Sequence, residues 1–381
     1  MQFIKSDKVR MKSDRKSNPE QRIRSPLTML IGLSFFLVAI ILITQQVYNI
    51  QIEMSNEDTI VVSNVEDSDG SSSSQIKWVD FTVSYEALCL AYEWDVKTHG
   101  TDCEVNWIEL LAYTAAKTGG KFEKKALEVI ENAAQVLSSG EKGLEELTEN
   151  MKYYPYYKEA YTAVLGGMVG EYQAEVLDEK GVKCYQTKYG LKAYFPIAQG
   201  FGYSHYDDFG AGRSFGYERK HLGHDMMGQI GTPIIAIESG VVEALGWNMY
   251  GGWRVGIRSF DGKRYYYYAH LRQNYPYAEG LEQGSIVTAG DVIGYMGHTG
   301  YSSTENVNNI EVTHLHWGLE LIFDEEHRAS GNEIWVDVYP LTQFLAKHTQ
   351  QTEKVEGTKE WVRSTDIVDP EVEKAETKPG E

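Results

Sequence analysis

The chain has 381 residues, enough for two compact domains and additional segments, and its 42% hydrophobic and 24% charged residues are typical of a globular protein. Its formal charge of −19 repels phosphate backbones, so we expect no nucleic-acid partner. The three cysteines allow at most one intramolecular disulfide, and the sequence leaves open whether Cys89 and Cys103 are bridged.

The N-terminal region combines a basic segment with an uncharged apolar run. Residues 1–25 carry eight Lys or Arg, and residues 26–47 contain no charge and have about the length of a membrane-spanning helix. Because basic residues stay on the cytoplasmic side, residues 1–25 are predicted to be cytoplasmic and the C-terminal domains extracellular. A cleaved signal peptide is the alternative, but no small-x-small cleavage site follows the run. We therefore predict a single-pass anchor in the cell membrane, with the lipid bilayer as the partner of this transmembrane helix.

Two further segments are acidic and too poor in apolar residues to form a core. Residues 48–78 are also Ser-rich, which predicts a flexible linker outside the membrane. Residues 349–381 have the same character and are predicted to form a disordered tail.

Residues 79–178 place apolar side chains at i, i+3 and i+4 in segments that end at Gly, which predicts an all-α extracytoplasmic domain of four or five helices. The stretch NWIELLAYTAAKTGGKF distantly resembles a helix of lysozyme-like domains, so a degenerate lysozyme-like domain is one interpretation. However, Lys117 stands where the catalytic Glu is expected, and no two carboxylates are paired by the sequence. A spacer, a docking surface or a regulatory cover is therefore the favoured role.

Residues 183–348 show a different periodicity. Short runs rich in β-branched and aromatic residues alternate with Gly turns, and no helical segments intervene. This pattern predicts a mainly-β antiparallel domain, and the chain as a whole is therefore predicted to be a multi-domain protein.

Histidines gather in this β-rich region. The motif HLGHD contains His221 and Asp225, the motif HLH contains His314 and His316, and His270 ends the aromatic run YYYYAH. Residues two apart on a strand point to the same face, so the two histidines of HLH are expected to project into one cleft. Three of these five side chains could hold a divalent ion and leave one position open for water, as in catalytic zinc sites.

The order of these motifs resembles the M23 family of zinc endopeptidases, of the lysostaphin and LytM type. The matching stretches are HLGHD, GTP, YAHL, GDVIGYMGHTG and HLH, which together cover about residues 200–325 in the order of the family. The sequence departs from the family at His224, where an aliphatic residue is usual, and in the loop 300–313, which is longer than the usual link. A longer loop suggests an altered grip on substrate, or a cleft that must open.

The resemblance implies that His221, Asp225 and His316 bind one zinc ion per chain and that His270 and His314 form the catalytic pair. Two neutral imidazoles and one carboxylate leave a charge near +1 on such a site, which can lower the pKa of a bound water to about 7. Neutral histidines can then accept the proton of this water and help stabilise the oxyanion.

The sequence therefore predicts a membrane-anchored zinc endopeptidase that hydrolyses amide bonds in peptidoglycan peptides. The alternative is a catalytically silent or activator-dependent scaffold of the LytM type, which binds a protein partner in an envelope or sporulation complex. Retention of all five candidate residues favours the enzyme.

Overall fold

The computed structural model describes residues 76–377 except residues 216 and 330. The predicted cytoplasmic segment 1–25, the predicted transmembrane helix 26–47 and nearly all of the predicted linker 48–78 lie outside the described residues. Within the described part of the chain, no helix has both the length and the apolar character needed to cross a bilayer.

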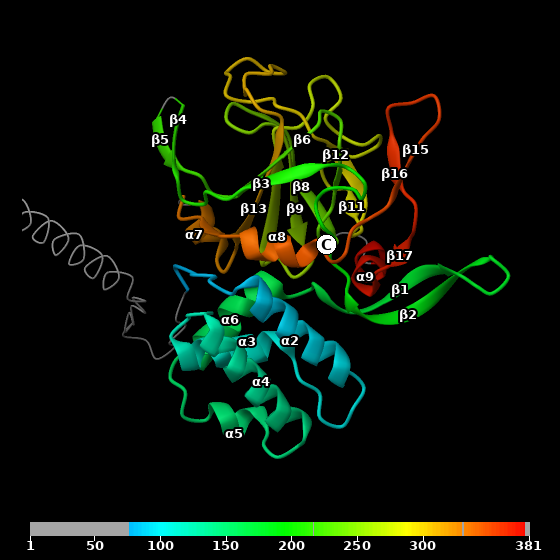
Figure 1. Cartoon of the computed structure of the whole chain (residues 1–381). Coiled ribbons are helices and arrows are strands. Elements are labelled where there is room, and N and C mark those ends of the chain that lie inside the picture. The colour runs from blue at the N-terminus through cyan, green and yellow to red at the C-terminus, as the bar shows by residue number, and fades with distance from the viewer. Residues whose placement is uncertain (1–75, 216, 330, 378–381) are drawn as a thin grey trace, which may run out of the picture. The chain divides into compact units, whose positions relative to one another are not determined.

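The described chain begins with helices, which lie together in Figure 1: α2 (Tyr85–Thr98), α3 (Trp107–Thr118), α4 (Lys124–Ser138), α5 (Leu144–Thr148) and α6 (Tyr154–Leu165). Polar caps fix two of their starts, because Ser84 accepts a hydrogen bond from the backbone of Ala87 and Asn106 accepts bonds from the first turn of α3. Helix α3 ends at Gly119 in the left-handed conformation. Cys89, Cys103 and Cys184 are all free thiols.

The predicted helical segment, residues 79–178, is wrong at its C-terminal end. The chain forms strand β1 (Val169–Leu177), which pairs with β2 (Lys183–Leu191) and with β17 (Ile367–Val368). The Asp178 side chain accepts hydrogen bonds from the backbone of Lys180 and Val182, and this tight turn folds β2 back onto β1. Backbone pairing across the hairpin therefore overrides the local helical pattern.

The prediction of a disordered tail over residues 349–381 is also wrong for its described part. This part contains β15 (Thr352–Lys354), β16 (Trp361–Arg363), β17 and α9 (Pro370–Thr377). Ile367 is buried in a small apolar cluster with Tyr172 and Ala174, and Asp369 forms a buried ion pair with Lys192 at 2.8 Å. The tail is ordered because its few apolar and charged anchors find partners elsewhere in the fold.

An antiparallel sheet of eight strands forms the rest of the molecule, and it confirms the mainly-β antiparallel prediction. Its strand order is β11-β8-β9-β10-β13-β6-β3, with β14 paired to β13. The strands are β3 (Tyr203–Tyr206), β6 (His224–Gly228), β8 (Gly240–Asn248), β9 (Gly252–Ser259), β10 (Arg264–Ala269), β11 (Ile286–Val287), β13 (His314–Leu321) and β14 (Ile334–Val336). Smaller elements complete the fold: β4 (Gly212–Phe215), β5 (Tyr217–Lys220), β7 (Pro233–Ile235), β12 (Val292–Tyr295), α7 (Glu325–Ala329) and α8 (Tyr339–Leu345).

The helices and the sheet share one apolar core, so the helices do not form a separate unit. Residues 73–381 form one compact unit, and the Trp107 ring of α3 stacks on the Phe344 ring of α8 with their centroids 5.7 Å apart. The buried guanidinium of Arg264 on β10 pairs with Glu238 at 2.8 Å and also donates to the carbonyl of Ala163 in α6 at 3.2 Å. These contacts attach the helices directly to the strands that carry the histidines.

Candidate metal centre and cleft

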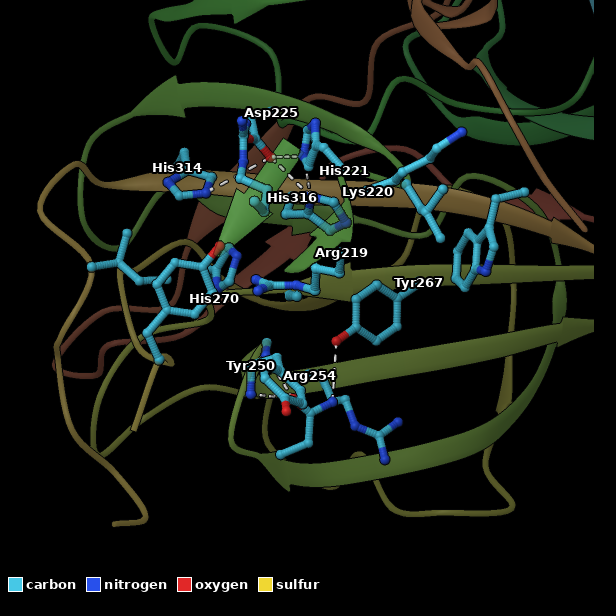
Figure 2. Close-up of a pocket in the computed structure, with 18 of the residues that line it drawn as sticks. Arg219, Lys220, His221, Asp225, Tyr250, Arg254, Tyr267, His270, His314 and His316 are labelled. Carbon is cyan, nitrogen blue, oxygen red and sulfur yellow. Dashed lines mark hydrogen bonds and ion pairs between the residues drawn. The ribbon is translucent and has the colours of Figure 1, made fainter. Parts of the chain in front are cut away.

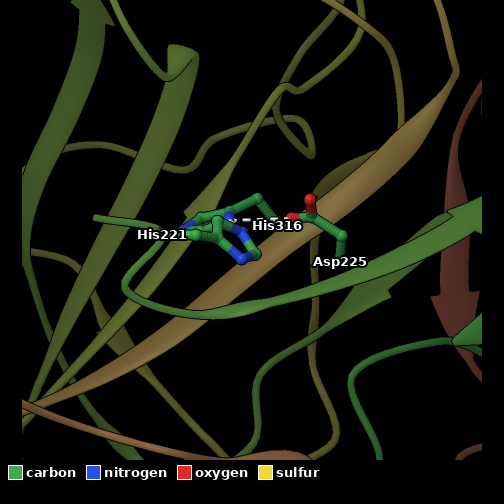
Figure 3. A group of neighbouring side chains, drawn as sticks. All are labelled: His221, Asp225 and His316. Carbon is green, nitrogen blue, oxygen red and sulfur yellow. Dashed lines mark hydrogen bonds and ion pairs between the residues drawn. The ribbon is translucent and has the colours of Figure 1, made fainter. Parts of the chain in front are cut away.

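Three of the predicted side chains converge on one point: His221, Asp225 and His316 (Figure 3). His221 lies between β5 and β6, Asp225 is on β6, and His316 faces Asp225 directly in the antiparallel pairing of β13 with β6. Asp225 Oδ1 lies 3.0 Å from His221 Nε2 and 2.9 Å from His316 Nδ1, and the two histidine nitrogens are 2.9 Å apart. Residues up to 95 positions apart in sequence thus present three ligand atoms to one centre.

The local backbone explains how these side chains are placed. The backbone N–H of His221 donates to the carbonyl of Ala211, and its own carbonyl accepts from Gly210, so the β4-β5 hairpin holds it firmly. Gly223 has no Cβ because one at that position would lie 2.6 Å from Cε1 of His316. The glycine of HLGHD is therefore required by the close approach of a ligand side chain.

Burial and hydrogen bonding shift the pKa of the Asp225 carboxyl group in opposite directions. Burial alone raises the pKa of Asp225, but the hydrogen bonds from His221 and His316 and the charges of the neighbouring histidines bring that pKa well below its usual range. Burial lowers the pKa of His316, against the pull of Asp225. The cluster therefore favours an ionised carboxylate beside an imidazole that tends to be neutral, which is the protonation pattern of metal ligands.

Asp208 was not predicted from the sequence, but it contacts one of the three clustered side chains. Its Oδ1 atom lies 2.8 Å from Nδ1 of His221, on the opposite side of the ring from the cluster. Arg213 contacts Oδ2 of Asp208 at 2.5 Å and reaches Oδ2 of Asp225 at 3.6 Å. No spacing in the sequence distinguishes Asp208 from its neighbour Asp207, because only the fold of the β4-β5 hairpin brings it to His221.

The two histidines predicted as a catalytic pair, His270 and His314, lie beside the cluster, with ring centroids 4.7 Å apart. Nδ1 of His270 donates to the carbonyl of Thr299 at 2.9 Å, and Nδ1 of His314 donates to the carbonyl of Val312 at 2.7 Å. Because both Nδ1 atoms carry the proton, both Nε2 atoms are acceptors when the rings are neutral. Nε2 of His314 lies 3.8 Å from Oδ1 of Asp225, so the expectation that His314 and His316 share a face is confirmed.

His270 adopts an unusual backbone conformation, with a φ of 63°. Positive φ is uncommon for residues other than glycine and requires support from the surrounding structure. Here the support is the backbone, since the N–H of His270 donates to the carbonyl of Gly251 and its carbonyl accepts from Gly297. Burial and the charges of His314 and His316 lower the pKa of His270 well below its usual value, so its ring is neutral.

His224, next to Asp225, is not part of the cluster. Adjacent residues of a strand point to opposite faces, and the Nε2 atom of His224 contacts Nδ1 of His205 at 2.8 Å on the other side of the sheet. Burial and the neighbouring His205 lower the pKa of His224 to about 4. This position is therefore a packed, neutral imidazole.

The cluster and the histidine pair line a cleft of about 880 Å³, and Figure 2 shows residues that line it. Its lining residues come from strands β3, β4, β5, β6, β8, β9, β10, β13 and β14, and residues 301 and 310–312 of the long loop 300–313 supply part of its rim. Tyr206, Tyr250, Tyr265, Tyr267 and Tyr301 contribute aromatic surface, and five cationic side chains also line the cleft. A cleft of this size, with aromatic and cationic side chains in its wall, can bind an extended polar ligand next to the cluster.

Comparison with known proteins relates part of the chain to peptidases. Residues 219–331 match peptidase family M23. The L-Ala–D-Glu endopeptidase of Bacillus subtilis strain 168 is 35% identical over 161 residues, which are 42% of this chain and 46% of that protein. Lysostaphin of Staphylococcus staphylolyticus is 37% identical over 89 residues, which are 23% of this chain and 18% of that protein.

The chain thus spans less than half of the length of either relative. One solved structure, from Ruminococcus gnavus ATCC 29149 and described as a candidate glycyl-glycine endopeptidase LytM, is 24% identical. It covers 72% of this chain and 92% of its own, with a TM-score of 0.48.

Proposed function

We propose that the chain is a zinc-dependent endopeptidase that hydrolyses amide bonds in peptidoglycan peptides, and the match of residues 219–331 to peptidase family M23 supports this proposal. The observation that carries the proposal is the convergence of His221, Asp225 and His316 at the edge of a cleft that also contains two further histidines. The Bacillus relative is named an endopeptidase, and the bond in its name, L-Ala–D-Glu, is the first to test.

The chemistry of the donor set fits zinc. Two imidazoles and one carboxylate are the ligands of many catalytic zinc sites, which keep a fourth position open. Tetrahedral bonds of about 2.0–2.1 Å place ligand atoms roughly 3.3 Å apart. The three atoms here are 2.9–3.0 Å apart, so a shift of a few tenths of an ångström accommodates the ion. We propose one zinc ion per chain, held by His221 Nε2, Asp225 Oδ1 and His316 Nδ1.

Zinc in this position supplies a Lewis acid, which polarises a peptide carbonyl and lowers the pKa of a water molecule. The protein supplies the proton transfers. Nε2 of His314 is an acceptor that lies 3.8 Å from Oδ1 of Asp225, so it takes the proton from the attacking water. The resulting imidazolium stabilises the oxyanion and then donates its proton to the leaving amine. His270 stays neutral, and its Nε2 accepts a hydrogen bond that orients the water or the substrate N–H.

Asp208 is expected to position His221 for this role. Replacing Asp208 with Ala removes the carboxylate whose Oδ1 atom lies 2.8 Å from Nδ1 of His221, and we expect the affinity for zinc to fall about 10- to 100-fold. Competition with a chromophoric chelator measures this affinity. The Asp208→Asn variant keeps one oxygen and is expected to lose less. An unchanged affinity in the Ala variant would mean that the hairpin backbone alone places His221.

We also propose that residues 26–47 anchor the protein in the cell membrane, with residues 1–25 in the cytoplasm and the peptidase outside. The support is the uncharged run of the sequence and the basic segment before it. An anchor of this kind confines hydrolysis to the wall of the cell that makes the enzyme. The scaffold alternative is not favoured, because the Bacillus relative is named an endopeptidase and all five candidate side chains line one cleft.

The decisive experiment incubates the purified full-length protein, in mild detergent, with purified peptidoglycan. Mass spectrometry then identifies the released fragments and the new amino termini. We expect release with zinc, none after treatment with a chelator, and recovery when zinc is restored. Release that is insensitive to chelation, or no release by the zinc-loaded protein, would argue against a metallopeptidase.

A further inference from the structure

The cleft carries positive charge that the metal centre does not use. Of its cationic side chains, Arg213 pairs with Asp208, and Arg328 pairs with Glu243 and Glu320. Arg219 and Arg254 are different, because neither forms an ion pair with any residue in the described part of the chain. Two unpaired guanidinium groups in one cleft are notable in a chain of formal charge −19, where carboxylates are abundant.

Arg219 is held in place by aromatic rings rather than by an acid. Its guanidinium carbon lies 5.0 Å from the ring centroids of both Tyr250 and Tyr301, and the Phe215 ring stacks on Tyr301 with their centroids 5.3 Å apart. Stacking of this kind fixes the plane of the guanidinium but leaves its N–H groups available. The Nη1 atom is shielded from solvent and has no hydrogen-bond partner among the described residues.

Arg254 of β9 lies further along the same cleft. Its Nε atom is also buried and has no hydrogen-bond partner among residues 76–377 as far as they are described. Burial raises the pKa of the Tyr267 hydroxyl, and the positive charges of Arg254 and Arg219 both oppose this rise, which places both charges within electrostatic reach of that hydroxyl. In Figure 2, Arg219 lies between His270 and Tyr267, and Arg254 lies further from the three ligand side chains.

An unsatisfied buried donor is costly, and the cost is removed when a ligand supplies the acceptor. Carboxylates are the natural acceptors for guanidinium groups, because two parallel N–H groups match two oxygens. The negative charge of the chain as a whole repels an acidic peptide, so a local cationic wall directs such a peptide to the cleft. A neutral peptide such as oligoglycine offers these two side chains only carbonyl acceptors, which form weaker hydrogen bonds with a guanidinium group than a carboxylate does.

We propose that Arg219 and Arg254 bind a free carboxylate of the substrate next to the scissile bond, and that the substrate is therefore an acidic stem peptide rather than a neutral glycine bridge. This inference rests on the proposed peptidase function. In an L-Ala–D-Glu peptide linked through the γ-carboxyl group, the α-carboxylate of D-Glu stands beside the bond to be cut. Arg219, which lies next to His270, is the guanidinium closer to the reacting groups.

Two synthetic peptides test the proposal with the full-length, zinc-loaded protein. Both contain an L-Ala–D-Glu bond and a γ-linked third residue, and they differ only in that the α-carboxylate of one is a carboxamide in the other. We expect the wild-type protein to cleave the carboxylate peptide with a kcat/KM at least about tenfold higher, as for a charge-assisted hydrogen bond. Arg219→Met and Arg254→Met are each expected to remove most of this preference, because cleavage of the carboxylate peptide falls much more than cleavage of the carboxamide peptide.

Matched controls separate recognition from folding. Arg219→Lys keeps the positive charge but lacks the two parallel N–H donors of a guanidinium group. It is expected to retain part of the preference for the carboxylate peptide. Arg272→Met removes another guanidinium that packs on tyrosine rings, 4.7 Å from the centroid of Tyr295, outside the cleft, and is expected to retain the full preference. Zinc content and cleavage of the carboxamide peptide report on the integrity of every variant.

Equal cleavage of the two peptides by the wild-type protein would overturn the inference and leave the peptidase assignment intact. The same holds if the Met variants lose activity equally on both peptides, since that would show a structural role. Failure of the zinc-loaded wild-type protein to cut either peptide or peptidoglycan itself would instead overturn the proposed function.

Discussion

Replacement of Asp225 with Ala is expected to remove zinc from the protein and to lower peptidoglycan hydrolysis by at least about a thousandfold, ~4 kcal/mol of transition-state stabilisation. Asp225 supplies the only carboxylate of the three-residue cluster and contacts both of its histidines. Without it, two neutral imidazoles remain, and they cannot neutralise a divalent ion in a buried site. Metal analysis of the purified variant and fragment release from peptidoglycan measure the two losses.

His316→Ala is expected to give the same result, because it removes the ligand on β13 that faces Asp225. The matched control is His224→Asn, which removes the neighbouring imidazole on the other face of β6. We expect this control to keep zinc and most of the activity. Normal digestion of the wall by the Asp225→Ala protein would contradict the assignment of the metal centre.

Replacement of His314 with Ala is expected to leave zinc in place and to lower kcat about 10²- to 10⁴-fold. The side chain does not belong to the three-residue cluster, but its Nε2 atom lies 3.8 Å from Asp225, at the position of a proton acceptor. The loss should therefore appear in kcat rather than in metal content. A comparison of metal content with single-turnover rates, on the same preparation, separates the two.

The pH profile gives a second measurement for the same variant. If His314 takes the proton of water, the acidic limb of the kcat profile reports its protonation and should disappear in His314→Ala. His270→Ala is expected to retain zinc and to lose activity as well, but to keep the acidic limb. If His314→Ala lost zinc instead, His314 would be a ligand, and if it kept nearly full kcat, the proton acceptor would be another group.

The mainly-β character of residues 183–348 could be predicted because it depends on local patterns. Alternating apolar residues, aromatic runs and Gly turns specify strands whatever their partners are. The local pattern gave a wrong prediction for Val169–Leu177, which was expected to be helical but forms a strand through pairing with β2 and β17. It also failed for the tail, whose order depends on distant partners such as Lys192. A low density of apolar residues predicts disorder only when no other part of the fold supplies the missing contacts.

The sequence by itself determined the identity of the five histidine and aspartate side chains, because short motifs fix residue types and their facing along a strand. Only the tertiary structure decided their distances, the contact of Asp208 with His221 and the exclusion of His224 from the centre. It alone also revealed that Arg219 and Arg254 lack acidic partners in the described chain. The physical reason is that ligand geometry, burial and charge pairing depend on residues far apart in sequence, which strand register brings together.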